Sequence, residues 1–150
     1  LTELDGLEDL KDVTVIAATN RPDIIDTALL RPGRFDKLIY IKTPDEEARK
    51  EIFKIHLRKK PLAKDINIDG LAKKTEGYTG ADIAAVCNQA VMASIREYIQ
   101  KHGKVDKEKL KQLKIEKRHI ETALEKVKPI SKSDLDKYTK ISERFDKNAT

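Results

Sequence analysis

Hydrophobic residues between positions 44 and 145 recur at intervals of three and four, which is the period of an amphipathic α-helix. Thr79 and Asp82 have the spacing of a capping box, and Gly103 is placed to end the helix that they begin. The pattern therefore predicts one long helix between Thr79 and Gly103. Its apolar face carries seven residues at helical spacing: Ile83, Val86, Cys87, Ala90, Val91, Ile95 and Tyr98.

Two helices are predicted before this one. The first is expected over residues 44–59, with Thr43 as its N-cap, and Pro61 lies beyond its end. A shorter helix is expected to follow Asn67 and to end before Gly77.

Two helices are predicted after it, separated by Pro129. One spans residues 116–128, and the other begins at Ser131 with Asp134 in its first turn. Their apolar positions again follow the helical period: Ile120, Leu124 and Val127 in the first, and Leu135, Tyr138, Ile141 and Phe145 in the second.

Two short apolar runs, at residues 13–18 and 37–41, differ from the rest of the chain. The first is largely β-branched and lacks clean alternation, which is typical of a strand buried on both faces of a parallel sheet, and the second is expected to be another short strand. Such strands need neighbours, so we expect partner strands from outside this segment. Without them, residues 13–41 are expected to be poorly ordered, swapped or covered by another chain.

The order of these elements predicts the fold class and the domains. We expect an α/β fragment, two strands of an incomplete parallel sheet, followed by an all-α region of four to five helices. Residues 1–43 would be the C-terminal part of an α/β domain, and residues 44–128 a complete helical domain. Residues 129–150 would form a C-terminal helix and tail. On this view the 150 residues are one part of a larger module.

Composition narrows the class of protein. The single Cys87 excludes a disulfide framework and favours a reducing compartment, so a cytoplasmic location is expected. No apolar run reaches the roughly 18 residues of a membrane span. The 31 basic and 26 acidic residues give a net charge of +5, which is weak support for a polyanionic partner. The lysine-rich residues 101–118 lack interleaved aromatics, which favours a solvated linker over a nucleic-acid interface.

Three polar residues near the predicted strands could act on a phosphate. Asn20 follows the first strand, at the edge where open α/β sheets bind ligands, although a turn asparagine is the alternative. Arg31 and Arg34 flank a Pro-Gly turn that would hold two guanidinium groups in place, as phosphoryl recognition requires. Ordinary surface ion pairs are the alternative for both arginines, with partners at Asp23, Asp26 or Asp36.

The helical region offers fewer candidates. His56 lies among apolar neighbours, where a packed histidine is commoner than a ligand, and no spacing around the three histidines indicates a metal site. Gly80 and Ala81 open the longest helix and leave room for close approach of a ligand, although simple capping is the alternative. The sequence holds no phosphate-binding loop and no apolar strand ending in Asp-Glu. This segment alone is therefore expected to be inactive on nucleotides.

Residues 17–22 (Ala-Ala-Thr-Asn-Arg-Pro) and 28–36 (Ala-Leu-Leu-Arg-Pro-Gly-Arg-Phe-Asp) together resemble the second region of homology of AAA ATPases. Residues 1–6 resemble the inter-subunit signalling segment before it. Residues 76–83 (Glu-Gly-Tyr-Thr-Gly-Ala-Asp-Ile) resemble the Gly-Ala turn of the small helical lid domain. With its tail, the chain is similar to the second ATPase module of the valosin-containing-protein family, in the style of its archaeal VAT members.

This resemblance implies a role for each candidate residue. Asn20 matches sensor 1, which orients the attacking water, and Arg31 and Arg34 match arginine fingers that reach a neighbouring subunit's nucleotide. Four residues match positions around the base and ribose: Ile52, His56, Gly80 and Ala81.

The resemblance also implies cofactors and partners. The parent would be a hexameric ATP hydrolase that unfolds or segregates proteins, using ATP and Mg²⁺ whose ligands lie outside this segment. Protein substrates are expected, with an adaptor or a protease as a further partner, whereas membranes and nucleic acid are not. Two alternatives stay open: a proteasome-activating AAA ATPase, and a helical interaction or nucleic-acid-binding module without ATPase activity.

Overall fold

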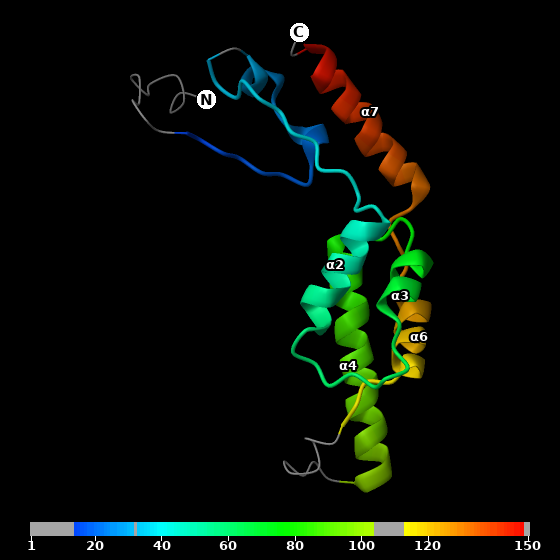
Figure 1. The fold of residues 1–150 in the computed structure, drawn as a ribbon. Helices are drawn as coiled ribbons and strands as arrows, with labels where there is room; N and C mark the ends of the chain where they lie inside the picture. Colours follow the sequence, from blue (N-terminus) through cyan, green and yellow to red (C-terminus); the bar gives the residue numbers. More distant parts are fainter. Residues whose placement is uncertain (1–13, 32, 104–112, 149–150) are drawn as a thin grey trace. The chain divides into compact units, whose positions relative to one another are not determined.

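The computed structural model describes residues 14–31, 33–103 and 113–148. The chain divides into two compact units (Figure 1). The helical unit comprises Lys42–Ile130, and the terminal unit comprises the residues up to Ile41 together with those from Ser131 onward. Most described residues are helical, as the sequence predicts.

The helical unit is built from four described helices: α2 (Glu46–Leu57), α3 (Ile68–Lys74), α4 (Gly80–His102) and α6 (Lys117–Lys126). The long helix α4 packs against α2 and α6, and α2 also packs against α3 (Figure 1). The core lies between these helices and includes Phe53, Leu57, Ile83, Val86, Cys87, Ile115, Ile120 and Ala123. The predicted apolar face of α4 is therefore the face that builds the core.

Local capping signals define where these helices begin and end. Thr79 and Asp82 form the predicted capping box of α4, and Gly103 ends that helix with a positive φ of 71°. Asn67 caps α3 through a hydrogen bond from the backbone N–H of Gly70. These predictions are confirmed, because each depends on residues within one helical turn.

The prediction that Thr43 caps the first helix is wrong. Asp45 is the N-cap of α2, since its carboxylate accepts a hydrogen bond of 2.8 Å from the backbone N–H of Ala48. Pro44 therefore lies before the helix, and its carbonyl accepts a hydrogen bond from the buried Arg49 instead.

The expected strands at residues 13–18 and 37–41 are not confirmed. Within the described residues both segments are extended but unpaired, and their apolar side chains, such as Ile16, Ile39 and Ile41, are largely exposed. In the described part of the chain, the only bridge of β type is an isolated parallel one between Leu62 and Ile115. A strand needs a neighbour for its backbone hydrogen bonds, and none is supplied here.

The terminal unit contains two short 3₁₀ helices, η1 (Pro22–Ile24) and η2 (Thr27–Leu30), and the helix α7 (Lys132–Asn148). Helix α7 contacts η1. Ser131 accepts a hydrogen bond from the backbone N–H of Asp134, as predicted for the start of α7. None of the helices in the described ranges has the length and apolar character needed to cross a membrane.

Candidate functional site

The turn after η2 holds Arg31 and Arg34 in a defined backbone. Gly33 has a φ of 87°, which an L side chain rarely adopts, and its N–H donates to the Asp36 carboxylate at 2.8 Å. The N–H of Phe35 reaches back to the carbonyl of Leu29 at 3.2 Å. The turn is therefore closed by hydrogen bonds on both sides of the glycine.

The two arginines of this turn differ in their surroundings. Arg31 is exposed, and its side chain makes no hydrogen bond or ion pair within the described residues. Arg34 is half-buried, and its Nη1 donates to the carbonyl of Ala28 at 2.6 Å. Arg34 is thus fastened to its own 3₁₀ helix, whereas Arg31 extends into solvent.

The acidic residues considered as ion-pair partners for Arg31 have other roles in the part of the chain described. Asp23 pairs with Arg21 through two short hydrogen bonds, of 2.7 and 2.8 Å, which lower the pKa of its carboxyl. Asp26 caps η2 by accepting from the N–H of Ala28. Asp36 closes the glycine turn. A surface ion pair therefore does not account for Arg31.

Asn20 lies in the same terminal unit, in a bend just before η1, and it is exposed. The adjacent Thr19 accepts a hydrogen bond from the backbone N–H of Arg21 at 3.0 Å, which shapes this bend.

The other four candidates belong to the helical unit. Ile52 and His56 are half-buried and lie one turn apart on α2, and Gly80 and Ala81 form the first turn of α4. A methyl group at the α-carbon of Gly80 would lie 3.9 Å from Cδ1 of Ile52. The fold therefore brings Ile52 and Gly80 together from different helices.

The side chains of Thr79 and Asp82, at the start of α4, bind each other. The carboxylate of Asp82 accepts from both the N–H and the hydroxyl of Thr79, at 2.8 Å each. This leaves an apolar edge formed by Ile52 and Gly80, next to the backbone N–H groups that begin α4. Among the residues described, no group of three His, Cys, Asp or Glu could hold a metal ion.

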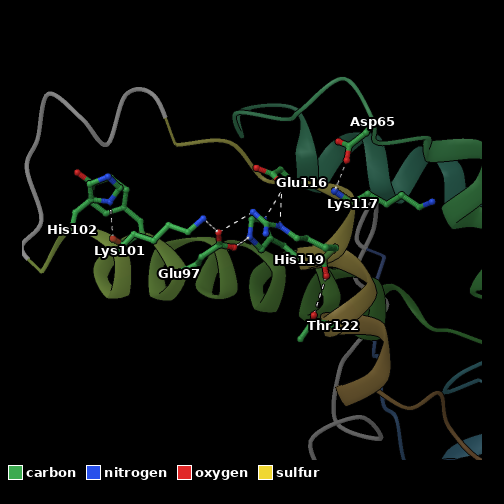
Figure 2. A network of polar contacts seen from close by, with 10 residues as sticks. Asp65, Glu97, Lys101, His102, Glu116, Lys117, His119 and Thr122 are labelled. Carbon is green, nitrogen blue, oxygen red and sulfur yellow. Dashed lines mark hydrogen bonds and ion pairs between the residues drawn. The ribbon is translucent and has the colours of Figure 1, made fainter.

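A network of polar side chains, which sequence reasoning missed, joins α4 to α6 (Figure 2). The carboxylate of Glu97 accepts hydrogen bonds from Lys101, from Arg118 at 2.8 Å and from Nε2 of His119 at 2.8 Å. The other ring nitrogen of His119 accepts from the backbone N–H of Glu116 at 3.0 Å, so Nε2 carries the proton. These contacts lower the pKa of Glu97 to about 2, chiefly through Lys101 and then His119.

A surface hollow of about 260 Å³ lies against this network. Its wall includes Tyr98, whose hydroxyl is buried and has no hydrogen-bond partner in the described part of the chain. The ring of Tyr98 stacks on His102 with 4.5 Å between ring centroids. The network links the C-terminal half of α4 to α6, whereas the stack lies within α4 itself.

The helical and terminal units each match a known protein family. Residues 1–43 match the family described as "ATPase family associated with various cellular activities (AAA)", and residues 65–112 match the AAA+ lid domain. Together the two matches cover more than half of the sequence. The chain belongs to the AAA ATPase family.

Its similarity to curated relatives extends beyond these two matches. The chain is 63% identical over 148 residues to the cell division cycle protein 48 homolog of Archaeoglobus fulgidus. The aligned region covers 97% of this chain and 20% of that relative. It is 44% identical over 139 residues to Protein SAV of Sulfolobus acidocaldarius, which covers 91% of this chain and 18% of that protein. The chain thus spans about a fifth of the length of the curated relatives that it matches.

Proposed function

We propose that this chain is part of a hexameric AAA ATPase that couples ATP hydrolysis to the unfolding or segregation of proteins. The similarity to the cell division cycle protein 48 homolog supports the class of ATPase. The main support is the exposed side chain of Arg31, which extends from a hydrogen-bonded turn. It makes no hydrogen bond or ion pair within the described residues. A guanidinium group held in this way is suited to a phosphate on another subunit.

The residues of the terminal unit would act at the phosphates. Arg31 and Arg34 are proposed as arginine fingers, and Asn20 as the sensor 1 residue that orients the attacking water. Arg34 must exchange its bond to the carbonyl of Ala28 for a phosphate, whereas Arg31 has no such bond to give up. We therefore propose Arg31 as the stronger of the two fingers.

The residues of the helical unit would hold the base and the ribose of ATP. Ile52 and Gly80 supply the apolar edge, with His56 and Ala81 beside them on the same helices. Bound ATP would supply the phosphoryl group, and Mg²⁺ would neutralise its charge through ligands from outside this segment.

The domain assignment follows from these roles. Residues 1–43 are proposed as the end of the nucleotide-binding α/β domain, residues 44–128 as the lid and residues 129–150 as a C-terminal helix and tail. Protein substrates, with an adaptor or a protease, are the proposed partners, in the cytoplasm.

The decisive experiment is the Arg31→Ala substitution in the full-length gene product. We expect ATP turnover to fall by about 10³-fold, the scale of an arginine finger, while nucleotide binding is retained. Arg21→Ala is the matched control, because Arg21 lies in the same unit but pairs with Asp23. Turnover that is unchanged in Arg31→Ala, or reduced equally in both variants, would remove Arg31 from this role.

A further inference from the structure

The chain passes between the two units twice, at Ile41–Lys42 and at Ile130–Ser131. Within the helical unit, one backbone carbonyl close to each of these two points accepts a hydrogen bond from a buried side chain. These carbonyls belong to Pro44 and Val127. We call residues 42–45 and 127–130 the connecting segments.

Arg49 binds the first connecting segment. Its side chain donates from Nη1 to the carbonyl of Pro44 at 2.9 Å, and from Nε to the carbonyl of Ala72 at 3.0 Å. Arg49 is only 6% exposed, and no carboxylate pairs with it in the described part of the chain. A buried guanidinium group without a counter-ion depends on its hydrogen bonds, so these two carbonyls define its position.

Tyr78 binds the second connecting segment. Its hydroxyl donates to the carbonyl of Val127 at 2.6 Å, and Tyr78 is only 7% exposed. Val127 is the C-cap of α6, and its own N–H bonds to the carbonyl of Ala123. The hydroxyl of Tyr78 therefore fixes the point at which the chain leaves α6.

Both contacts involve the same short stretch, residues 72–80, because Arg49 also binds the carbonyl of Ala72 and Tyr78 lies within the stretch. The hydroxyl of Thr75 donates to the carbonyls of Leu71 and Ala72, and the N–H of Tyr78 donates to the carbonyl of Thr75. Tyr78 is followed by Thr79 and the first turn of α4. Hydrogen bonds thus connect both connecting segments to residues 72–78, which lie directly before the first turn of α4 in the sequence.

We propose that Arg49 and Tyr78 are positioning residues that fasten the two connecting segments to residues 72–80. A ligand that moves the first turn of α4 would then move both connecting segments with it. The fastening stands on the hydrogen bonds alone, whereas the response to a ligand rests on the proposed nucleotide contact at Gly80 and Ala81.

The fastening is tested in this chain of 150 residues by amide hydrogen exchange. Tyr78→Phe removes only the hydroxyl that binds the carbonyl of Val127. The end of α6 should then open more often, so the N–H of Val127, which bonds to the carbonyl of Ala123, should exchange roughly two- to tenfold faster. Tyr98→Phe is the matched control, because that hydroxyl is also buried but has no partner within the described residues. Unchanged exchange at Val127 in Tyr78→Phe, or an equal rise in Tyr98→Phe, would overturn the fastening by Tyr78.

Arg49→Lys tests the first segment in the same way. A lysine cannot donate to the carbonyls of both Pro44 and Ala72 in the geometry of a guanidinium group. The segment around Pro44 and Asp45 should then open more often, so the N–H of Ala48, which bonds to the Asp45 carboxylate, should exchange faster. Arg96→Lys, on the exposed face of α4, should leave Ala48 unchanged. Exchange at Ala48 that does not respond to Arg49→Lys would overturn the role of Arg49.

The response to a ligand is tested in the full-length protein, with ADP and Mg²⁺ as the probe. In the unmodified protein we expect protection at Gly80 and Ala81 and a changed exchange rate at Val127. In Tyr78→Phe the protection at Gly80 should remain, while the change at Val127 is lost, which a merely structural role would not produce. If ADP still changes the exchange rate of Val127 in Tyr78→Phe, Tyr78 does not transmit the response from Gly80 to the second connecting segment.

Failure of the proposed function would give a different result. If ADP leaves Gly80 and Ala81 unprotected in the unmodified protein, the proposed nucleotide contact is wrong, and so is the proposed response of the connecting segments to a ligand. The exchange rates of Val127 and Ala48 in the chain of 150 residues still decide whether Tyr78 and Arg49 fasten the connecting segments.

Discussion

Nε2 of His119 lies 2.8 Å from Oε2 of Glu97, so one hydrogen bond links α6 directly to α4. The same carboxylate also binds Lys101 and Arg118, and the other nitrogen of His119 accepts from the N–H of Glu116 at the start of α6. His119 thus has two tasks, since it takes part in the capping box of α6 and binds Glu97 on α4. The first two predictions concern this pair.

The contribution of Glu97 to stability should disappear in acid. Its pKa is lowered to about 2 from 4.5, the value of an ordinary glutamate, so the unfolded chain binds the proton more readily than the folded one. The stabilisation is therefore fully present above about pH 4.5 and is lost as the pH falls towards 2. Because a quarter of the side chain is exposed, we expect only about 1 kcal/mol.

Urea unfolding of the unmodified chain and of Glu97→Gln measures this difference at pH 6, 4 and 3. Glu121→Gln is the control, since Glu121 contacts only lysines, at 3.7 and 3.8 Å, and lies at the surface. We expect the control to differ from the unmodified chain by less than about 0.5 kcal/mol at each pH. A Glu97→Gln effect of equal size at pH 6 and pH 3 would contradict the prediction.

His119→Ala should destabilise the helical unit by about 2–3 kcal/mol. It removes a buried ring, the acceptor of the Glu116 N–H and a donor to Glu97, and it leaves a partly buried amide without its partner. Urea unfolding at pH 7 measures the loss. His102→Ala is the comparison, because His102 is exposed, and its loss should cost less than about 1 kcal/mol. Equal costs for the two substitutions would show that the network adds nothing.

The parts of this fold that were predictable from sequence depend on neighbours within one turn. The capping box of Thr79 and Asp82 and the positive φ at Gly103 are of this kind. The bond between Glu97 and His119 joins residues 22 positions apart, and no local pattern encodes such a distance. The burial of Arg49 could not be predicted for another reason. Arginine is seldom buried, and its two acceptors are backbone carbonyls, which have no sequence signature.

The charged stretch at residues 101–118 shows how composition can mislead. Its lysines favoured a solvated linker, yet Ile115 is 1% exposed and belongs to the core. The N–H of Ile115 bonds to the carbonyl of Pro61, and its carbonyl accepts from the N–H of Ala63. The four aliphatic residues of this stretch, Val105, Leu110, Leu113 and Ile115, are scattered among many charges, so the periodic signal is too weak to predict this pairing.

Ile52 is a candidate only through the family resemblance. Nothing in the spacing of Ile52 and Gly80 indicates that they meet, because they lie on different helices. For Arg31 the sequence left a surface ion pair open, and the structure makes that reading weaker because Asp23 pairs with Arg21.

Thr79→Ala should destabilise the chain by about 1 kcal/mol, the usual cost of losing an N-cap side chain. The hydroxyl of Thr79 accepts from the N–H of Asp82, and that N–H has no replacement partner within α4. Thr122→Ala is the matched control, since Thr122 lies inside α6 and its hydroxyl only bonds back to the carbonyl of Arg118. Alanine is the better helix former there, so the control should be neutral or slightly stabilising. Thermal unfolding distinguishes the two, and equal shifts in Tm would contradict the prediction.

Gly80→Ala should leave the fold intact and weaken nucleotide binding. The new methyl group would meet only Cδ1 of Ile52, at an ordinary contact distance of 3.9 Å, so Tm should be unchanged or slightly higher. In the full-length protein, we expect the methyl group to occupy the space beside the base and to reduce affinity for ADP by about tenfold, roughly 1.4 kcal/mol. Gly77→Ala is the opposite control: its φ of 79° disfavours any side chain, so stability should fall by about 1 kcal/mol. Thermal unfolding and ADP titration separate the two effects, and an ADP affinity unchanged in Gly80→Ala would exclude Gly80 from the nucleotide site.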